Sequence, residues 1–310
     1  REIQRDLTRR WLRVEEALWD GIEALSRELE RAAAVGQPVS RWRLNQLELY
    51  QRLLAQLEAE QRRFARYASG LISREQYMAA EDGIEYGYDS VRSLYAEAGL
   101  QSPAFDVLDV RAVNAMIGMS ANGTPLDELL RASYPETVTA ITDTLVQATA
   151  LGYNPRKTAR LVRDAMAGNL QRALVVSRTE QMRALRIGNV REYQASGVVR
   201  MYRRRASRSS RTCLACLVED GRLYSVGEQF SDHPNGRCFA EPVVEGIPSP
   251  FGQSGLAWFE AQPQEVQRSI MGDAHYQAWR AGAFGLKDAA RMHSHPVWGE
   301  QPQVVPLKQL

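Results

Sequence analysis

All three cysteines of this 310-residue chain lie within 26 residues, next to one of its four histidines. The two segments read Cys213-Leu-Ala-Cys216 and His233-Pro-Asn-Gly-Arg-Cys238. Three thiolates and one imidazole are the ligand set of a closed tetrahedral zinc site, which leaves no position open for a substrate. The spacing therefore predicts a small module that a structural Zn²⁺, bound by these four side chains, holds closed, because such a module is too small to bury a sufficient core.

The residues between the two ligand pairs predict how the chain returns. The segment Glu219-Asp-Gly-Arg222 is a turn signal and residues 223–226 suit a strand, which together with a strand over 198–203 predicts a β-hairpin. Two alternatives to zinc stay open: three reduced cysteines without metal, or a disulfide within the trio. The odd cysteine count argues against a disulfide framework. The pair His293-Ser-His295 is interpreted as a polar loop rather than a second metal site.

The rest of the chain predicts helices. Apolar residues recur every three or four positions from Ile3 to Leu29, and further helices are expected over 44–64, 73–98, 126–151, 155–168, 170–196, 256–270 and 274–280. Breaks are expected at 36–38, 69–70 and 168–169, and Ser40 is a candidate N-cap. The N-terminal stripe is either buried within the chain or docks a partner. The fold class predicted is mainly α with a small zinc-stabilised β-hairpin module (α+β), in three parts: 1–100, 101–245 and 246–310.

The charge is distributed unevenly. The net charge is only +2, yet residues 156–211 hold fifteen Arg or Lys against three acids. For 156–191 we favour local pairing on a solvated helix face. The denser run predicts contacts with nucleic acid or an acidic partner, because clustered arginines repel one another unless an anion is near; its members are Arg200, Arg203, Arg204, Arg205, Arg208 and Arg211.

Composition and motifs exclude several classes of function. Apolar content of 44% is ordinary for a globular protein, and no run of eighteen apolar residues is present, so no membrane contact is expected. There is no phosphate-binding glycine loop, nucleophile elbow or zinc-protease motif. No catalytic residue and no enzymatic activity are therefore predicted. The first residue is Arg1 rather than methionine, which leaves the natural N-terminus open.

Several short motifs occur in a familiar order over residues 125–245. They are Gly152-Tyr-Asn-Pro155 before a basic helix, Arg178-Thr179-Glu180 with Arg186, Asn189 and Tyr193, Ser196-Gly-Val198, Arg211-Thr-Cys213-Leu-Ala-Cys216, Asp220-Gly221 and His233-Pro-Asn-Gly-Arg-Cys238. Together they resemble the head-morphogenesis family of tailed phages, the minor head proteins of the phage Mu F type. One departure is Gly236, where many relatives carry a cysteine or another residue.

The resemblance implies a virion structural protein. Such a protein is a minor capsid component that lies inside the head near the portal vertex, passes through the host cytoplasm during assembly, and acts in head assembly and in packaging or delivery of DNA. Its partners would be the portal and other capsid proteins, with packaged double-stranded DNA as a further candidate. Arg178, Thr179 and Glu180 would be structural and pack on the zinc module. The alternatives are a nucleic-acid-binding zinc protein outside a virion, a toxin-like enzyme on the same scaffold, and a pure adaptor.

Overall fold

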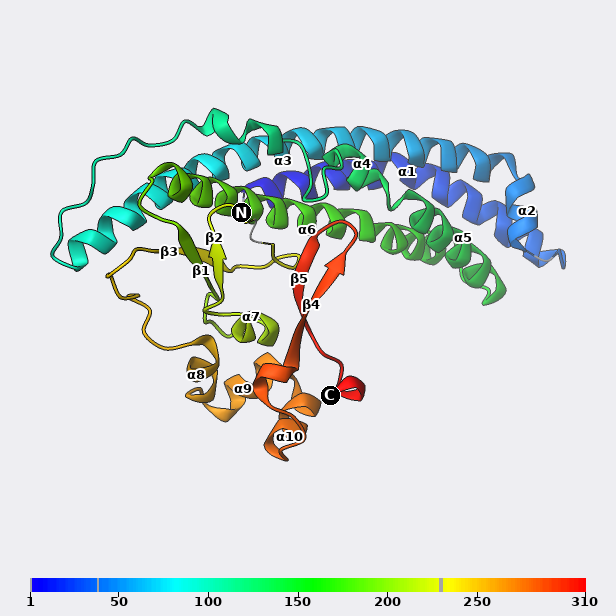
Figure 1. The fold of residues 1–310 in the computed structure, drawn as a ribbon. Coiled ribbons are helices and arrows are strands. Elements are labelled where there is room, and N and C mark those ends of the chain that lie inside the picture. Colours follow the sequence, from blue (N-terminus) through cyan, green and yellow to red (C-terminus); the bar gives the residue numbers. More distant parts are fainter. Residues whose placement is uncertain (1, 38, 229–230) are drawn as a thin grey trace. The chain divides into compact units, whose positions relative to one another are not determined.

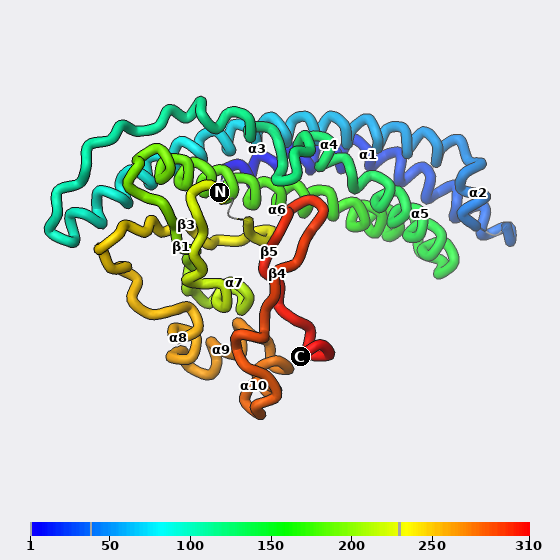
Figure 2. Tube along the Cα trace, in the orientation of Figure 1, coloured from blue at the N-terminus to red at the C-terminus, as the bar shows by residue number. Residues whose placement is uncertain are grey.

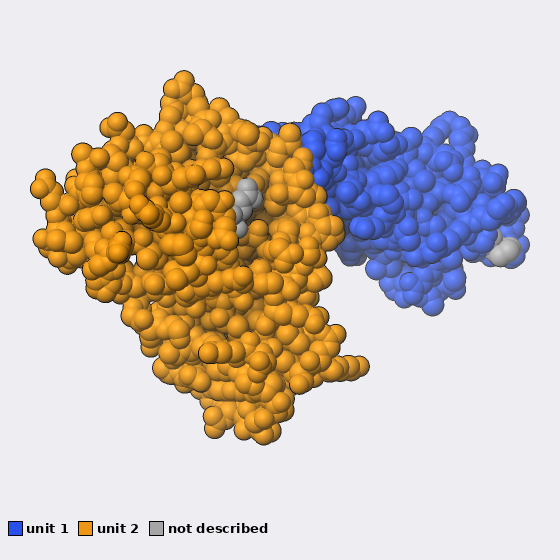
Figure 3. Space-filling view, viewed as in Figure 1, with its two compact units in different colours: residues 1–72, 124–177 blue, residues 73–123, 178–310 orange. Residues whose placement is uncertain are grey.

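Long helices dominate the computed structural model, which describes residues 2–37, 39–228 and 231–310 (Figure 1). Helices take up 63% of it and strands 9%, which confirms the mainly α class with small antiparallel sheets. The chain divides into two compact units (Figure 3): Arg1–Ile72 with Thr124–Ser177, and Ser73–Gly123 with Arg178–Leu310. The proposed division at 100 and 245 follows other boundaries and stays a prediction.

Unit 1 is a set of packed helices. Its elements are α1 (Glu2–Ala34), α2 (Arg41–Gln46), the first part of α3 (Glu48–Glu97), α4 (Leu126–Arg131), α5 (Tyr134–Ala150) and the first part of α6 (Pro155–Ala195), whose path can be followed in Figure 2. The whole apolar stripe from Ile3 to Leu29 is buried here, with Trp11 edge-on against Phe64 at a ring-centroid distance of 5.0 Å. The stripe is therefore core rather than a docking face.

Two predicted helix breaks in this part of the chain are wrong. Ser69-Gly70 lies inside α3 and Gly168-Asn169 lies inside α6. A glycine costs a helix only about 1 kcal/mol, which a long packed helix tolerates. Asn169 stays helical with its side chain buried, where its Oδ1 accepts hydrogen bonds from Gln61 Nε2 (2.8 Å) and Ser133 Oγ (2.7 Å).

Helix ends follow local signals more closely. Ser40 Oγ accepts from the backbone N–H of Arg43 at 3.2 Å, which confirms this N-cap; Pro38, part of the preceding break, lies outside the described residues. The helix expected over 126–151 is divided into α4 and α5, with Pro135 in the first turn of α5. Proline is tolerated in a first turn because it lacks only a donor that has no partner there.

Unit 2 combines the remaining parts of α3 and α6 with a sheet module and the tail. Its other elements are η1 (Val110–Met116), β1 (Met201–Arg205), α7 (Leu214–Val218), β2 (Leu223–Ser225), β3 (Phe239–Val243), α8 (Gly255–Glu260), α9 (Gln264–Met271), α10 (Asp273–Arg280), η2 (Leu286–Ala289), β4 (Ala290–His295), β5 (Gly299–Val304) and η3 (Leu307–Gln309). The antiparallel sheet has the order β2-β1-β3, so the predicted hairpin gains a third strand and β1 becomes its centre.

Within unit 2, α3 and α6 approach backbone to backbone through two glycines. A Cβ added at Gly83 would lie 2.1 Å from the carbonyl oxygen of Leu185, and one added at Gly188 would lie 2.2 Å from that of Ala80. Neither position has room for a methyl group. This close approach places the 178–193 segment of α6 as a rigid support behind the sheet module.

The tail is folded differently from expectation in two places. The helix expected over 256–270 is two helices, α8 and α9, separated at Pro263. His293 and His295 lie on β4, which pairs with β5, so the polar-loop interpretation is wrong. The tail packs into the same apolar core as the sheet module, with Phe259 and Tyr193 both buried in it. None of the described helices is long and apolar enough to span a membrane.

Candidate metal centre

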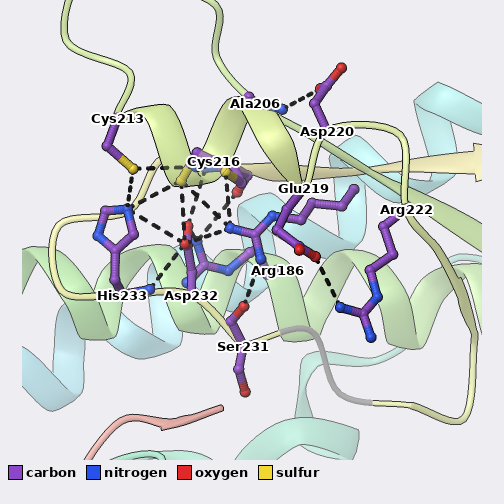
Figure 4. Close-up of polar contacts among 12 residues, drawn as sticks. Arg186, Ala206, Cys213, Cys216, Glu219, Asp220, Arg222, Ser231, Asp232 and His233 are labelled. Carbon is purple, nitrogen blue, oxygen red and sulfur yellow. Dashed lines mark hydrogen bonds and ion pairs between the residues drawn. The ribbon is translucent and has the colours of Figure 1, made fainter. Parts of the chain in front are cut away.

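The predicted ligands come from two places in the sheet module, the start of α7 and the segment between β2 and β3; Figure 4 labels Cys213, Cys216 and His233. Cys213 is the N-cap of α7 and Cys216 lies in its first turn, where the Cys216 N–H donates to Cys213 Sγ at 3.4 Å. His233 lies on the segment between β2 and β3, and its Nε2 is 3.2 Å from Cys213 Sγ and 3.1 Å from Cys216 Sγ. The three ligand atoms lie within 4.8 Å of one another, as a shared metal ion requires.

A second group of three shares Cys216 and brings in an acid. The ligand atoms of Cys216, Asp232 and Cys238 also lie within 4.8 Å of one another, and all three side chains are buried. Cys238 therefore belongs to a different group of three from Cys213 and His233, and Cys216 is common to both groups. Sequence reasoning missed Asp232, although its position directly before His233 was a signal. His233 Nδ1 lies 2.9 Å from the Pro234 carbonyl oxygen, an outer-shell contact that leaves Nε2 available to a metal.

Two buried arginines surround this cluster. Arg204 donates to Asp232 Oδ1 at 2.8 Å, to Cys238 Sγ at 3.4 Å and to Cys216 Sγ at 3.6 Å. Arg186 Nη1 lies 3.5 Å from Asp232 Oδ2 and 3.3 Å from the carbonyl oxygen of Cys238, to which it donates. With all three thiols ionised and His233 neutral, as metal binding requires, two guanidiniums, one carboxylate and three thiolates would carry two net negative charges, which one divalent cation would cancel. Because buried charge must be compensated, this set of side chains fits a divalent metal.

The sulfur atoms are polarised unequally. The pKa of Cys213 is lowered to about 4, first by the hydrogen bond with Cys216 and then by His233, against the effect of burial. The pKa of Cys238 is also lowered, first by Cys216 and then by the Arg204 charge, whereas that of Cys216 is raised. The pKa of His233 is raised to about 9, chiefly by its hydrogen bond with Cys213. The thiolate is the form that binds metal, and these shifts favour it at Cys213 and Cys238, whereas Cys216 and His233 would each release a proton when a metal binds.

The Arg178-Thr179-Glu180 motif lies on α6 behind this centre. Thr179 Oγ1 accepts from the backbone N–H of Asn235 at 3.1 Å, which links α6 to the segment between His233 and Cys238. Glu180 is fully buried and accepts from Arg183 Nε (2.7 Å) and Gln76 Nε2 (2.9 Å). Burial raises the pKa of Glu180, against the lowering effect of Arg183. Arg178 is exposed.

Four of the six arginines of the run pair with carboxylates of the same chain, and two of these four are buried. Arg204 and Arg205 are buried, and Arg205 pairs with Glu241 and lies 3.5 Å from Asp220. For these two arginines the predicted contact with nucleic acid or an acidic partner is wrong. Further pairs join Arg208 to Asp220 at 2.8 Å and Arg203 to Glu241 at 3.6 Å, whereas Arg200 and Arg211 are exposed.

Comparison of the chain with protein-family models, with curated proteins and with solved structures found no match. Fold and site together define an α+β protein whose three-stranded module carries a Cys/His/Asp cluster able to hold a metal ion. The group is compatible with zinc, because thiolate and imidazole are the ligands that Zn²⁺ prefers in structural sites.

Proposed function

We propose that this chain is a minor head protein of a tailed phage. It lies inside the head near the portal vertex, contacts the portal and other capsid proteins, and acts in head assembly and in packaging or delivery of DNA. A structural Zn²⁺ bound by Cys213, Cys216, His233 and Cys238 closes its sheet module. Bound zinc supplies a folding constraint rather than chemistry.

The proposal rests on hydrogen bonds between the motif residues that carry the resemblance. Thr179 is bonded to Asn235, as described above. Arg186 donates to the carbonyl oxygen of Cys238 at 3.3 Å, and the Tyr193 hydroxyl donates to that of Ala240 at 3.0 Å. Every one of these bonds joins the 178–193 motif to the 233–240 segment. The motif residues of 178–193 and those of 233–240 therefore pack against each other. This contact supports a fold shared with the minor head proteins that the sequence resembles.

The enzyme alternative finds less support. Glu180, the acid of the motif, carries a raised pKa, which is a common property of catalytic acids. Its side chain, however, has no exposed surface and its carboxylate accepts from Gln76 and Arg183. Thr179 is buried as well. A substrate would have no access to either group, so the motif serves to hold the module against α6.

The alternative of a zinc-dependent nucleic-acid protein outside a virion rested on the arginine run. Arg204, Arg205 and Arg208 are neutralised by carboxylates of the same chain. The two exposed arginines of the run, Arg200 and Arg211, are too few to favour this alternative over a head protein.

Cross-linking within intact particles of the encoding phage tests the proposal. We expect cross-links from this chain to the portal protein, at a few copies per particle. Absence of the chain from purified particles would exclude a head protein. Elemental analysis of the isolated protein tests the metal separately, and we expect one zinc per chain.

A further inference from the structure

The arginines of the sheet module fall into two groups. Residues 200–238 contain eight arginines, and five of them form ion pairs with carboxylates of the same chain: Arg203, Arg204, Arg205, Arg208 and Arg222. The other three are Arg200, Arg211 and Arg237. All three are exposed, and among the described residues none of them has an ion-pair partner. These three are therefore the module's positive charges that remain uncompensated.

Two of the three share one site. Arg211 and Arg237 line the same small hollow, about 20 Å³ and partly open to solvent, together with Thr212, Asn235 and the metal-ligand side chains. No carboxylate is among the described residues that line it. Arg200, in contrast, does not line this hollow. The hollow's exposed lining side chains are two guanidiniums and the Asn235 amide, which match the chemistry of a phosphate group, whereas its less exposed lining includes the three cysteines of the metal centre.

We infer that Arg211 and Arg237 form a phosphate-binding mouth at the entrance to the metal centre. Arg211 precedes Cys213 by two residues, and Arg237 is directly followed by Cys238. The metal ligands therefore hold the backbone of both arginines, which lowers the entropy lost when the guanidiniums engage a phosphate. The phosphate can belong to a nucleic-acid backbone or be a free ion. The inference rests on the geometry of the module, and only the role of metal in it rests on the zinc proposed above.

The test measures binding of a 20-base-pair DNA duplex to the full chain over a range of salt concentrations. Each phosphate contact contributes about 0.9 to the slope of log K against log salt, which is about eightfold in affinity at 0.1 M salt. We expect Arg211→Gln and Arg237→Gln each to reduce the slope by about 0.9, and the double variant to lose about 60-fold in affinity at 0.1 M salt. Arg200→Gln is the matched control, an exposed arginine of the same module, and should bind as the wild type does.

Further measurements separate the source of the phosphate from general effects. If the mouth takes free phosphate, inorganic phosphate should raise the thermal unfolding temperature of the wild type more than that of the double variant. The reference is chloride at equal ionic strength. A duplex effect without this phosphate effect assigns the site to a nucleic-acid backbone. If the variants have the same zinc content and the same unfolding temperature as the wild type, they are folded. Wild-type behaviour of the double variant in both assays, or an equal loss in Arg200→Gln, overturns the inference.

The metal is tested in the same assay. Removal of zinc by a chelator should reduce duplex affinity at least as far as the double variant does. Full affinity of the metal-free protein, with the arginine variants still impaired, would keep the mouth and refute the positioning role of the metal. Failure of the head-protein proposal is distinguishable, because it concerns the particle and leaves all these in vitro results unchanged.

Discussion

Arg204 and Asp232 form an ion pair of 2.8 Å in which neither side chain has any exposed surface. Arg204 is on the central strand β1, and Asp232 directly precedes the candidate ligand His233. Their pairing joins the sheet to the metal cluster through a single buried contact. The local sequence predicts that Arg204 contacts an anion outside the chain. It pairs instead with a carboxylate 28 residues further along the same chain.

We expect Asp232→Asn to destabilise the protein by about 3–5 kcal/mol, because it leaves two buried guanidiniums, Arg204 and Arg186, without their carboxylate. Urea unfolding followed by circular dichroism measures the loss. The matched control is Asp273→Asn, which removes a carboxylate that is 81% exposed and lies 3.9 Å from Arg268; exposed pairs of this kind contribute about 0–1 kcal/mol. Equal effects of the two substitutions would refute the importance of the buried pair.

Removing the metal should lower stability sharply. At a free zinc concentration 1,000 times Kd, binding contributes about 4 kcal/mol to stability, so excess chelator should lower the unfolding temperature by roughly 10 °C. Calorimetry measures the shift. Cys213→Ser should abolish it and increase hydrogen exchange in the sheet module, whereas the exposed Ser210→Ala should leave both unchanged. A protein that contains no stoichiometric zinc, or whose unfolding ignores chelator, would contradict a structural metal.

Glycines of α3 and α6 should respond in opposite directions to the same substitution. Gly83→Ala and Gly188→Ala are each expected to cost about 3 kcal/mol, because the new methyl groups meet the carbonyl oxygens of Leu185 and Ala80. Gly70→Ala and Gly168→Ala, on the same two helices with nothing within 4 Å, should stabilise by about 0.5–1 kcal/mol through helix propensity. Chemical denaturation of all four variants checks this, and a uniform sign would disprove the close approach.

The stability of the wild type should carry a signature of Glu192 as pH changes. Burial raises the pKa of this carboxyl against the lowering effect of the hydrogen bond from the Leu108 N–H, 2.8 Å long. Below the unfolded pKa of about 4.3 both states are protonated and the raised pKa has no effect on stability. Above it the unfolded state ionises first, so wild-type stability falls until the pH passes the folded pKa.

Glu192→Gln removes this dependence. The unfolding free energy of the variant relative to wild type should therefore rise between pH 4 and pH 8, measured by urea unfolding at several pH values. Glu245→Gln, at an exposed position, controls for the loss of one negative charge. A difference that stays constant over this range would show that Glu192 does not retain its proton on folding.

Short-range patterns predicted the parts of the site that depend on neighbours in sequence. The C-x-x-C spacing places Cys213 at the cap of α7 and Cys216 in its first turn, because one turn of helix brings both sulfurs to one side. Ser40 caps its helix for the same local reason. Both features are decided within four residues.

In α3 and α6, packing outweighs the local sequence signal for a helix break. Glycine weakens a helix by about 1 kcal/mol, so Gly70 and Gly168 favour breaks on propensity alone. Burial of apolar side chains on either side contributes more than that per residue, and both helices continue. At Gly83 and Gly188 the same residue type has a different role, since only the partner helix reveals that a methyl group would not fit.

The amino-acid sequence determined the helical stripe of α1, the caps and the cysteine–histidine pattern, because each depends on side chains a few positions apart. The tertiary structure decided which arginines face solvent. Asp220, Asp232 and Glu241 lie 12–46 residues from the arginines they neutralise, and chain folding alone brings opposite charges at such separations together. It likewise added Asp232 to the metal cluster and left Arg211 and Arg237 exposed beside it.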